Sequence, residues 1–88
     1  MIECQLKVEN QLGLHARPAA LFVQTTNKFK SSIRVIKEDM EVDGKSIMGL
    51  LMLAASSGTI LKIIVDGEDE YSLLEQLKKI FTNKFGEA

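Results

Sequence analysis

The stretch Gly13-Leu14-His15-Ala16-Arg17-Pro18-Ala19-Ala20 lies where the sequence changes from a strand pattern to a helix pattern. It contains the only histidine and the only proline of the chain. The start of a helix offers free backbone N–H groups and the positive end of the helix dipole, which together favour an anion. An imidazole at that point, followed two residues later by an arginine, suits the stretch to carrying a phosphate group.

The residues before this stretch alternate between apolar and polar side chains from Ile2 to Val8. A period of two predicts a strand with one buried and one wet face. Cys4 falls on the buried side, so we interpret it as a small core residue rather than a reactive thiol. Asn10-Gln11-Leu12-Gly13-Leu14 then forms a loop, in which the glycine frees the backbone.

The residues after His15 change to an apolar spacing of three and four, which predicts an amphipathic helix from Ala16 to about Asn27 or Lys28. Pro18 falls in its first turn, where the missing N–H costs nothing. His15 or Ala16 occupies the N-cap, although neither side chain caps well. The predicted inner face consists of Ala16, Ala19, Ala20, Val23 and Thr26, with Phe22 at its margin.

The remaining sequence predicts a hairpin, a short helix, a strand and a final helix. The hairpin pairs residues 33–37 with 40–43, Ser46 caps a helix over 47–53, and residues 59–66 form a central strand. Acidic residues 68–70 open the last helix, which Gly86 ends and whose inner stripe is Leu74, Leu77, Ile80 and Phe81. This βαββαβα order predicts an α+β fold: an open-faced β-sandwich with a four-stranded, mainly antiparallel sheet and three helices packed on one face.

The composition limits the possible functions of the chain. Its 88 residues form one domain, residues 1–88, and 45% apolar with 26% charged residues is typical of a folded globular protein. A net charge of −1 with dispersed lysines and arginines argues against direct nucleic-acid binding. One cysteine and one histidine make neither an intramolecular disulfide nor a metal site. We expect a cytoplasmic monomer with no membrane insertion, metal or cofactor.

The chemistry is concentrated at His15. The positive end of a helix disfavours a protonated imidazole, so His15 is expected to act as a neutral nucleophile, and Arg17 can hold the oxygens of a phosphoryl group. Nothing else in the sequence resembles a general base, a metal cluster or a nucleotide-binding loop. We therefore expect such a chain to pass a phosphoryl group between other proteins. From spacing alone, the alternative is that His15 is an ordinary loop residue and Arg17 a solvated charge.

Residues 13–19 resemble the active-site signature of the HPr family, the histidine-containing phosphocarriers of the bacterial phosphoenolpyruvate-dependent sugar phosphotransferase system. The resemblance extends from about residue 2 to residue 84, and the element order agrees. It implies that His15 takes a phosphoryl group on Nδ1 from Enzyme I and passes it to sugar-specific IIA domains. It also implies that Arg17 steadies that group and that the chain is not an enzyme.

Ser46 is first of all a favourable helix cap. The segment from Lys45 to Leu51, however, resembles the regulatory-serine segment of HPr proteins from Gram-positive bacteria. That resemblance implies phosphorylation of Ser46 by a bifunctional HPr kinase/phosphorylase, slower acceptance of phosphate by His15, and binding of a catabolite-control repressor. A phosphate at a helix start meets N–H groups, so the fold is expected to survive it.

The short helix also predicts a docking surface. Leu50, Leu53 and Ala54 can cover the sheet, which leaves the opposite side with little to bury it, and methionines suit a surface that fits several partners. By resemblance this surface borders His15. The predicted partner-binding residues are Ala16, Ala20, Ile47, Met48, Leu51 and Met52.

Three alternatives remain at the level of the sequence. The loop from Asn10 to Leu12 also resembles paralogues of nitrogen-linked phosphotransfer chains, and Gly49 replaces a basic residue common in enteric relatives, so partner preference need not follow theirs. A mainly regulatory binding protein acting through Ser46 is the second alternative, against which the presence of His15 argues. A ligand-binding or RNA-binding α+β module ranks last, because the strands lack surface aromatics and the chain lacks a basic stripe.

Overall fold

The structure is a computed structural model that describes residues 1–87. Its elements follow the predicted order, and their ends agree with the predicted ends to within a few residues. They are β1 (Ile2–Lys7), α1 (Ala16–Thr26), β2 (Ser32–Lys37), β3 (Met40–Asp43), α2 (Ile47–Met52), β4 (Ile60–Asp66), α3 (Glu70–Thr82) and the short 3-10 helix η1 (Lys84–Gly86). The α+β fold is confirmed.

The four strands form one antiparallel sheet in the order β1-β4-β2-β3. β4 lies between β1 and β2, which confirms its predicted central position. Residues in register across the sheet share a face. One such row crosses all four strands and points to the core: Cys4, Ile63, Val35 and Val42.

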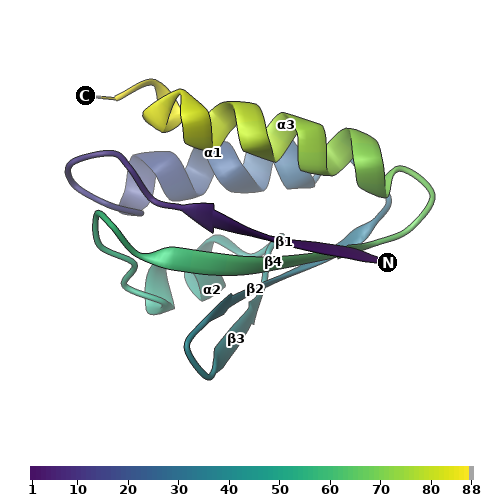
Figure 1. Ribbon diagram of the computed structural model, residues 1–88, viewed down its shortest axis with the longest axis horizontal. Helices are drawn as coiled ribbons and strands as arrows, with labels where there is room; N and C mark the ends of the chain where they lie inside the picture. The colour runs from purple at the N-terminus through teal and green to yellow at the C-terminus, as the bar shows by residue number, and fades with distance from the viewer. Residues whose placement is uncertain (88) are drawn as a thin grey trace.

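The helices cover one face of this sheet. In Figure 1, α1 and α3 run side by side along the sheet, and the shorter α2 lies beside β2 and β3. Phe22 of α1 packs edge-on against Phe81 of α3, with ring centroids 6.1 Å apart. The other face carries ion pairs between exposed side chains, such as Lys62 with Glu3. None of the helices that residues 1–87 form is long and apolar enough to cross a membrane.

The buried face of α1 is rotated about the helix axis relative to the predicted inner face. Phe22 is fully buried at the centre of that face rather than at its margin, whereas Ala16 is exposed. The helix packs against both the sheet and α3, so its buried arc is centred on the largest apolar side chain. The buried residues of α1 are Pro18, Ala19, Phe22, Thr25 and Thr26.

Three details of the other helices also differ from the prediction. Helix α3 ends at Thr82, not at Gly86, because Lys84 and Phe85 adopt positive φ angles of 53° and 56° and turn the chain into η1. Ile80 is only half-buried on α3, where Leu73 is fully buried instead. Ala54 lies beyond the end of α2 with φ of 50° and is exposed, so it does not cover the sheet.

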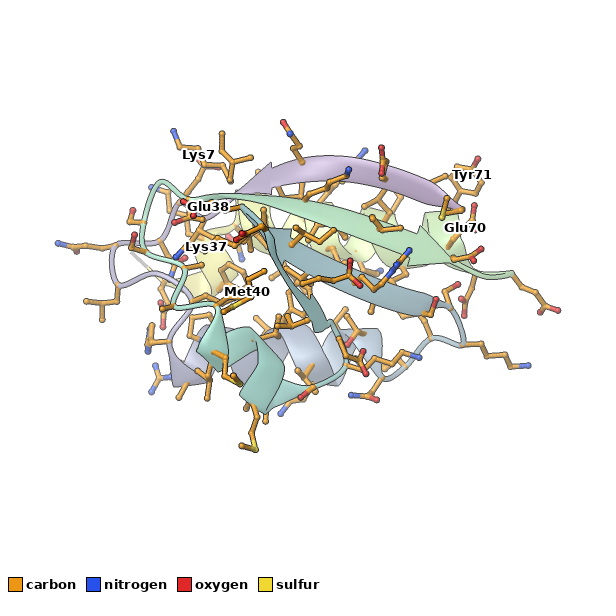
Figure 2. The ribbon with its side chains drawn as sticks, turned by 90° about the horizontal axis from the view of Figure 1, so that it is seen from below. Lys7, Lys37, Glu38, Met40, Glu70 and Tyr71 are labelled. Atoms are coloured by element: carbon orange, nitrogen blue, oxygen red, sulfur yellow. The ribbon has the colours of Figure 1, made fainter. Side chains whose placement is uncertain are left out.

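The two ends of the sheet carry different groups. Figure 2 shows Lys37, Glu38 and Met40 at the tip of the β2–β3 hairpin, opposite the end where Glu70 and Tyr71 lie. At the hairpin end, the Lys37 ammonium donates a hydrogen bond to the Leu53 carbonyl at 3.0 Å. This contact ties the C-terminal end of α2 to the sheet and so helps to fix the surface that α2 presents.

Candidate functional site

His15 occupies the N-cap of α1, at the end of the loop that follows β1. Its position is set by Leu14, which is buried and whose N–H donates to the Ala55 carbonyl at 2.8 Å. The loop can approach this close only because residue 13 is glycine. Gly13 has φ of +73°, and a Cβ there would lie 2.5 Å from the Ala55 carbonyl oxygen.

The start of α1 leaves donors free for a ligand. The first intrahelical bond runs from the Ala19 N–H to the His15 carbonyl at 3.0 Å, and the His15 side chain caps no N–H group. The N–H groups of Ala16 and Arg17 therefore make no hydrogen bond within residues 1–87. Pro18 is buried in this turn and has no N–H to satisfy.

Arg17 is exposed beside this helix start. Within the described part of the chain its guanidinium makes neither a hydrogen bond nor an ion pair, so its five donors are available to an anion. A planar guanidinium can bind two oxygens of a phosphoryl group at once.

The His15 ring is held from its Nε2 side by a residue that the sequence did not point to. Nε2 lies 3.0 and 3.1 Å from the two carboxylate oxygens of Glu87. The side chain of His15 is 38% exposed and that of Glu87 only 17%. Nδ1 makes no hydrogen bond to any of residues 1–87, so it is the nitrogen open to a reacting group.

The Glu87 carboxylate is itself held by Asn10. The Asn10 amide donates to Glu87 Oε1 at 2.9 Å and to the Gly13 carbonyl at 2.6 Å. The hydrogen bond from His15, followed by that from Asn10 and by the positive charge of Arg17, lowers the pKa of Glu87 below its ordinary value. Asn10 is fully buried, a fact that its place in a predicted surface loop did not suggest.

No local pattern links these residues, because Glu87 is separated from His15 by 72 positions and from Asn10 by 77. Figure 1 shows the cause: the C-terminal end of the chain and the β1–α1 loop lie at the same end of the molecule. Asn10 lies between the polar residues Glu9 and Gln11, so its burial had no signal in the sequence either.

An open depression of about 300 Å³ joins His15 to the end of α2. Leu12, Leu51 and Ala54 contribute to its lining, so the α2 surface does border His15. The predicted exposure of Ile47, Met48, Leu51 and Met52 is confirmed, with exposed fractions of 38, 72, 41 and 67%. Leu12, which is 74% exposed, belongs to the same apolar region and was not predicted. Ala16 is exposed and Ala20 half-buried.

Ser46 caps α2 as predicted. Its hydroxyl oxygen accepts a hydrogen bond from the Gly49 N–H at 3.0 Å. A side chain at Gly49 would be crowded, because its Cβ would lie 3.2 Å from the Val42 Cβ. Glycine at this position therefore lets α2 approach β3 closely.

Residues 1–87 contain no cluster of three or more potential metal ligands. Cys4 is half-buried against the core, and burial raises the pKa of its thiol, which fits a packing role. The fold and site together define a small α+β protein with a single nucleophilic imidazole at a helix start, beside a free arginine.

Comparison with known proteins agrees with this class. Residues 2–83 match the family described as "PTS HPr component phosphorylation site". The phosphocarrier protein HPr of Xylella fastidiosa is 47% identical over 87 residues, covering 99% of this chain and 98% of that protein. The crystal structure of HPr-C-His from Thermoanaerobacter tengcongensis superposes with a TM-score of 0.96 at 45% identity, covering 100% of this chain and 99% of that one.

A further similar structure is that of a protein described by its role in catabolite repression. The solution structure of Crh, described as the Bacillus subtilis catabolite repression HPr, is 44% identical with a TM-score of 0.64, covering 91% of this chain and 95% of that one. The chain belongs to the PTS HPr family. As a member of that family it is a phosphocarrier of the phosphotransferase system and not an enzyme.

Proposed function

We propose that His15 is the residue that carries the phosphoryl group, accepting it on Nδ1 from Enzyme I and passing it to IIA components in the cytoplasm. The observation that supports this most strongly is the free Nδ1 of His15 beside an unpaired arginine and two unpaired N–H groups. No other described residue combines a nucleophilic atom with a set of anion-binding donors.

The transfer is a single displacement. The Nδ1 lone pair attacks phosphorus, the Nδ1–P bond forms, and the bond from phosphorus to the donor breaks, with the electron pair returning to the donor. Arg17 and the N–H groups of Ala16 and Arg17 bind the phosphoryl oxygens, whose negative charge also suits the helix start. The reverse displacement delivers the group to the acceptor protein.

Enzyme I and the IIA components dock, in this proposal, on the apolar surface around the depression. Ala16 and Ala20 lie on α1 beside His15, and their small side chains let a partner approach the ring. The exposed apolar residues of α2 supply most of the contact area: Ile47, Met48, Leu51 and Met52. The protein acts as a monomer, since one copy holds the whole site.

Ser46 is proposed as a regulatory site for an HPr kinase/phosphorylase. The hydroxyl is half-buried next to the exposed side chains of Ile47 and Met48, so a phosphate there adds negative charge to the docking surface. The expected consequences are slower transfer from Enzyme I and recognition by a catabolite-control repressor. The similarity to Crh, which is described as a catabolite repression HPr, supports this reading.

The carrier role is tested with purified Enzyme I and phosphoenolpyruvate. We expect an acid-labile, hydroxylamine-sensitive phosphate on the protein and its complete loss in His15→Ala, with the label retained in Ser46→Ala. A label that persists in His15→Ala contradicts the assignment. For Ser46, ATP and a cognate kinase are expected to give an acid-stable phosphate that Ser46→Ala lacks. A kinase that is active on another HPr protein but leaves this chain unlabelled argues against regulation there.

A further inference from the structure

We propose that Glu87 is a positioning residue for the phosphocarrier reaction, which holds the Nε2 proton of His15 and compensates the positive charge that the ring gains at Nδ1. This inference rests on the proposed role of His15. It assigns a function to Glu87, which lies outside the HPr-like signature of residues 13–19.

The contact is built by the fold and is not a chance approach of a mobile tail. Lys84 and Phe85 both adopt left-handed backbone conformations, which are costly for side chains other than glycine. Phe85 is buried at 5% exposure and packs on Phe81 with ring centroids 4.8 Å apart, which offsets that cost. The turn then directs Glu87 to the N-terminal end of α1, where both carboxylate oxygens are within 3.1 Å of Nε2.

Asn10 fixes the other side of the carboxylate. Its amide nitrogen bridges Glu87 Oε1 and the Gly13 carbonyl, and its side chain is fully buried. Asn10 Oδ1 is a buried atom without a hydrogen-bond partner among the described residues. A buried amide with an unsatisfied oxygen is costly. We interpret the buried Asn10 amide as the group that orients the Glu87 carboxylate, which in turn orients the His15 ring.

The chemistry follows from which nitrogen holds the proton. A carboxylate at Nε2 accepts a hydrogen bond only from an Nε2–H group, so the tautomer with a lone pair on Nδ1 is selected. When Nδ1 attacks phosphorus, the proton stays on Nε2 and the ring becomes a phosphoimidazolium cation. The Glu87 carboxylate then lies beside the new positive charge, in the way that a buried aspartate supports the histidine of a serine protease.

The surrounding charges are consistent with this role. Among residues 1–87, Arg17 is the cationic side chain whose charge reaches the Glu87 carboxylate, and it helps to lower the pKa of that carboxyl. Arg17 belongs to the same helix start, so it can bind the phosphoryl group at Nδ1 while Glu87 remains at Nε2. The two charged residues thus serve opposite sides of one ring.

The test compares Glu87→Gln and Glu87→Ala with the wild-type protein and with Glu75→Gln. Glu75 is an exposed residue of α3 that lies near Ile2 and Glu3 rather than near His15. Rapid-quench measurements with saturating phosphorylated Enzyme I are expected to show acceptance about tenfold slower in Glu87→Gln and slower still in Glu87→Ala, the loss expected for one charge-assisted hydrogen bond. Glu75→Gln is expected to match the wild type. Thermal unfolding checks that all variants fold.

The second readout is the pH profile for hydrolysis of the phosphorylated protein. The carboxylate stabilises the protonated phosphorylated ring, so acid-promoted hydrolysis is expected to begin at lower pH in Glu87→Gln than in the wild type. Slower acceptance with an unchanged pH profile makes Glu87 merely structural and overturns the proposal, as do unchanged or faster rates. If the wild type carries no phosphate on His15 at all, the carrier assignment fails instead, and the two failures are thereby distinguished.

Discussion

At the scale of single residues, the two arginines of the chain differ in what they contact. Arg34 lies on the uncovered face of the sheet and pairs with Glu41 at 3.5 Å. Arg17 is exposed at the start of α1 and makes no such pair within residues 1–87. An arginine without a structural partner is free to bind a charged group that arrives from outside.

We expect Arg17→Ala to slow phosphoryl acceptance by about ten- to a hundredfold, because it removes a charge-assisted hydrogen bond to the transferred group. Its effect on the free energy of unfolding is expected to be small, since the side chain is exposed. Rapid-quench kinetics with phosphorylated Enzyme I measure the rate, and Arg34→Ala is the matched control. Equal rates for the two variants argue against a role for Arg17.

Asp69 is the residue whose ionisation is most strongly shifted. Its carboxylate accepts hydrogen bonds from the Ser31 hydroxyl, from the Lys30 N–H at 2.8 Å and from the Ser31 N–H at 2.9 Å. Led by the Ser31 hydroxyl, these bonds lower the pKa of Asp69 from 3.8 to about 2. They join the start of α3 to the loop between α1 and β2.

A pKa that is lower in the folded than in the unfolded protein gives stability above the unfolded value, and that stability is lost as the pH falls. We therefore expect Asp69→Asn to be less stable than the wild type at neutral pH. The difference is expected to shrink between pH 3.8 and about 2, as the wild-type carboxyl becomes protonated. Urea unfolding across this pH range measures it, with the exposed Glu68→Gln as control. A difference that is independent of pH contradicts this account.

At the scale of elements, α2 is short and depends on its ends. Six residues form too short a helix to be stable alone. The Ser46 hydroxyl caps its first turn, the Lys37 ammonium donates to the carbonyl of the C-cap residue Leu53, and the buried Leu50 anchors the helix between them. These three contacts hold an apolar surface open to solvent in a fixed orientation.

Ser46→Ala is expected to lower the free energy of unfolding by about 1 kcal/mol, because the Gly49 N–H loses its acceptor. Ser46→Asp keeps an acceptor at the cap and is expected to fold with nearly wild-type stability. Its added charge beside Ile47 is nevertheless expected to slow phosphoryl acceptance. Urea unfolding and rapid-quench kinetics separate the two effects, with the exposed Ser57→Ala as control. Normal acceptance by Ser46→Asp argues against a docking surface at this position.

At the scale of the whole molecule, aromatic contacts in the core connect α1, α3 and η1. Phe81 contacts Phe22 edge-to-face and Phe85 at a tilt, and all three rings are buried. These aromatic contacts join α1, at whose start His15 lies, to the segment that bears Glu87. Core packing and the geometry of the site are therefore coupled.

Phe22→Ala is expected to destabilise the fold by about 3–5 kcal/mol, a large share of the total stability of a domain of this size. Tyr71→Ala, which removes an aromatic side chain that is 70% exposed, is expected to change the stability by about 0.5 kcal/mol or less. Thermal and urea unfolding compare the two. Similar losses in both variants contradict the central position of Phe22 in the core.

The sequence by itself determined the order of the elements, the cap at Ser46, the helix start at His15 and the exposure of the α2 surface. These features depend on spacing and on neighbours close in the chain, such as the alternation in β1 or the serine three residues before Gly49. The prediction for α1 had nearly the correct helix length, and only the direction of its buried face was wrong.

Only the tertiary structure showed which group holds Nε2 of His15 and so leaves Nδ1 free. The Glu87 carboxylate reaches the ring because α3 returns along α1 and the left-handed turn at Lys84 and Phe85 directs the chain end back over the first loop. A contact across 72 positions has no local periodicity to reveal it. The sequence at residues 13–19 thus indicates the imidazole that we propose to react, while the packing of α1, α3 and residues 84–87 leaves Nδ1 as its free nitrogen.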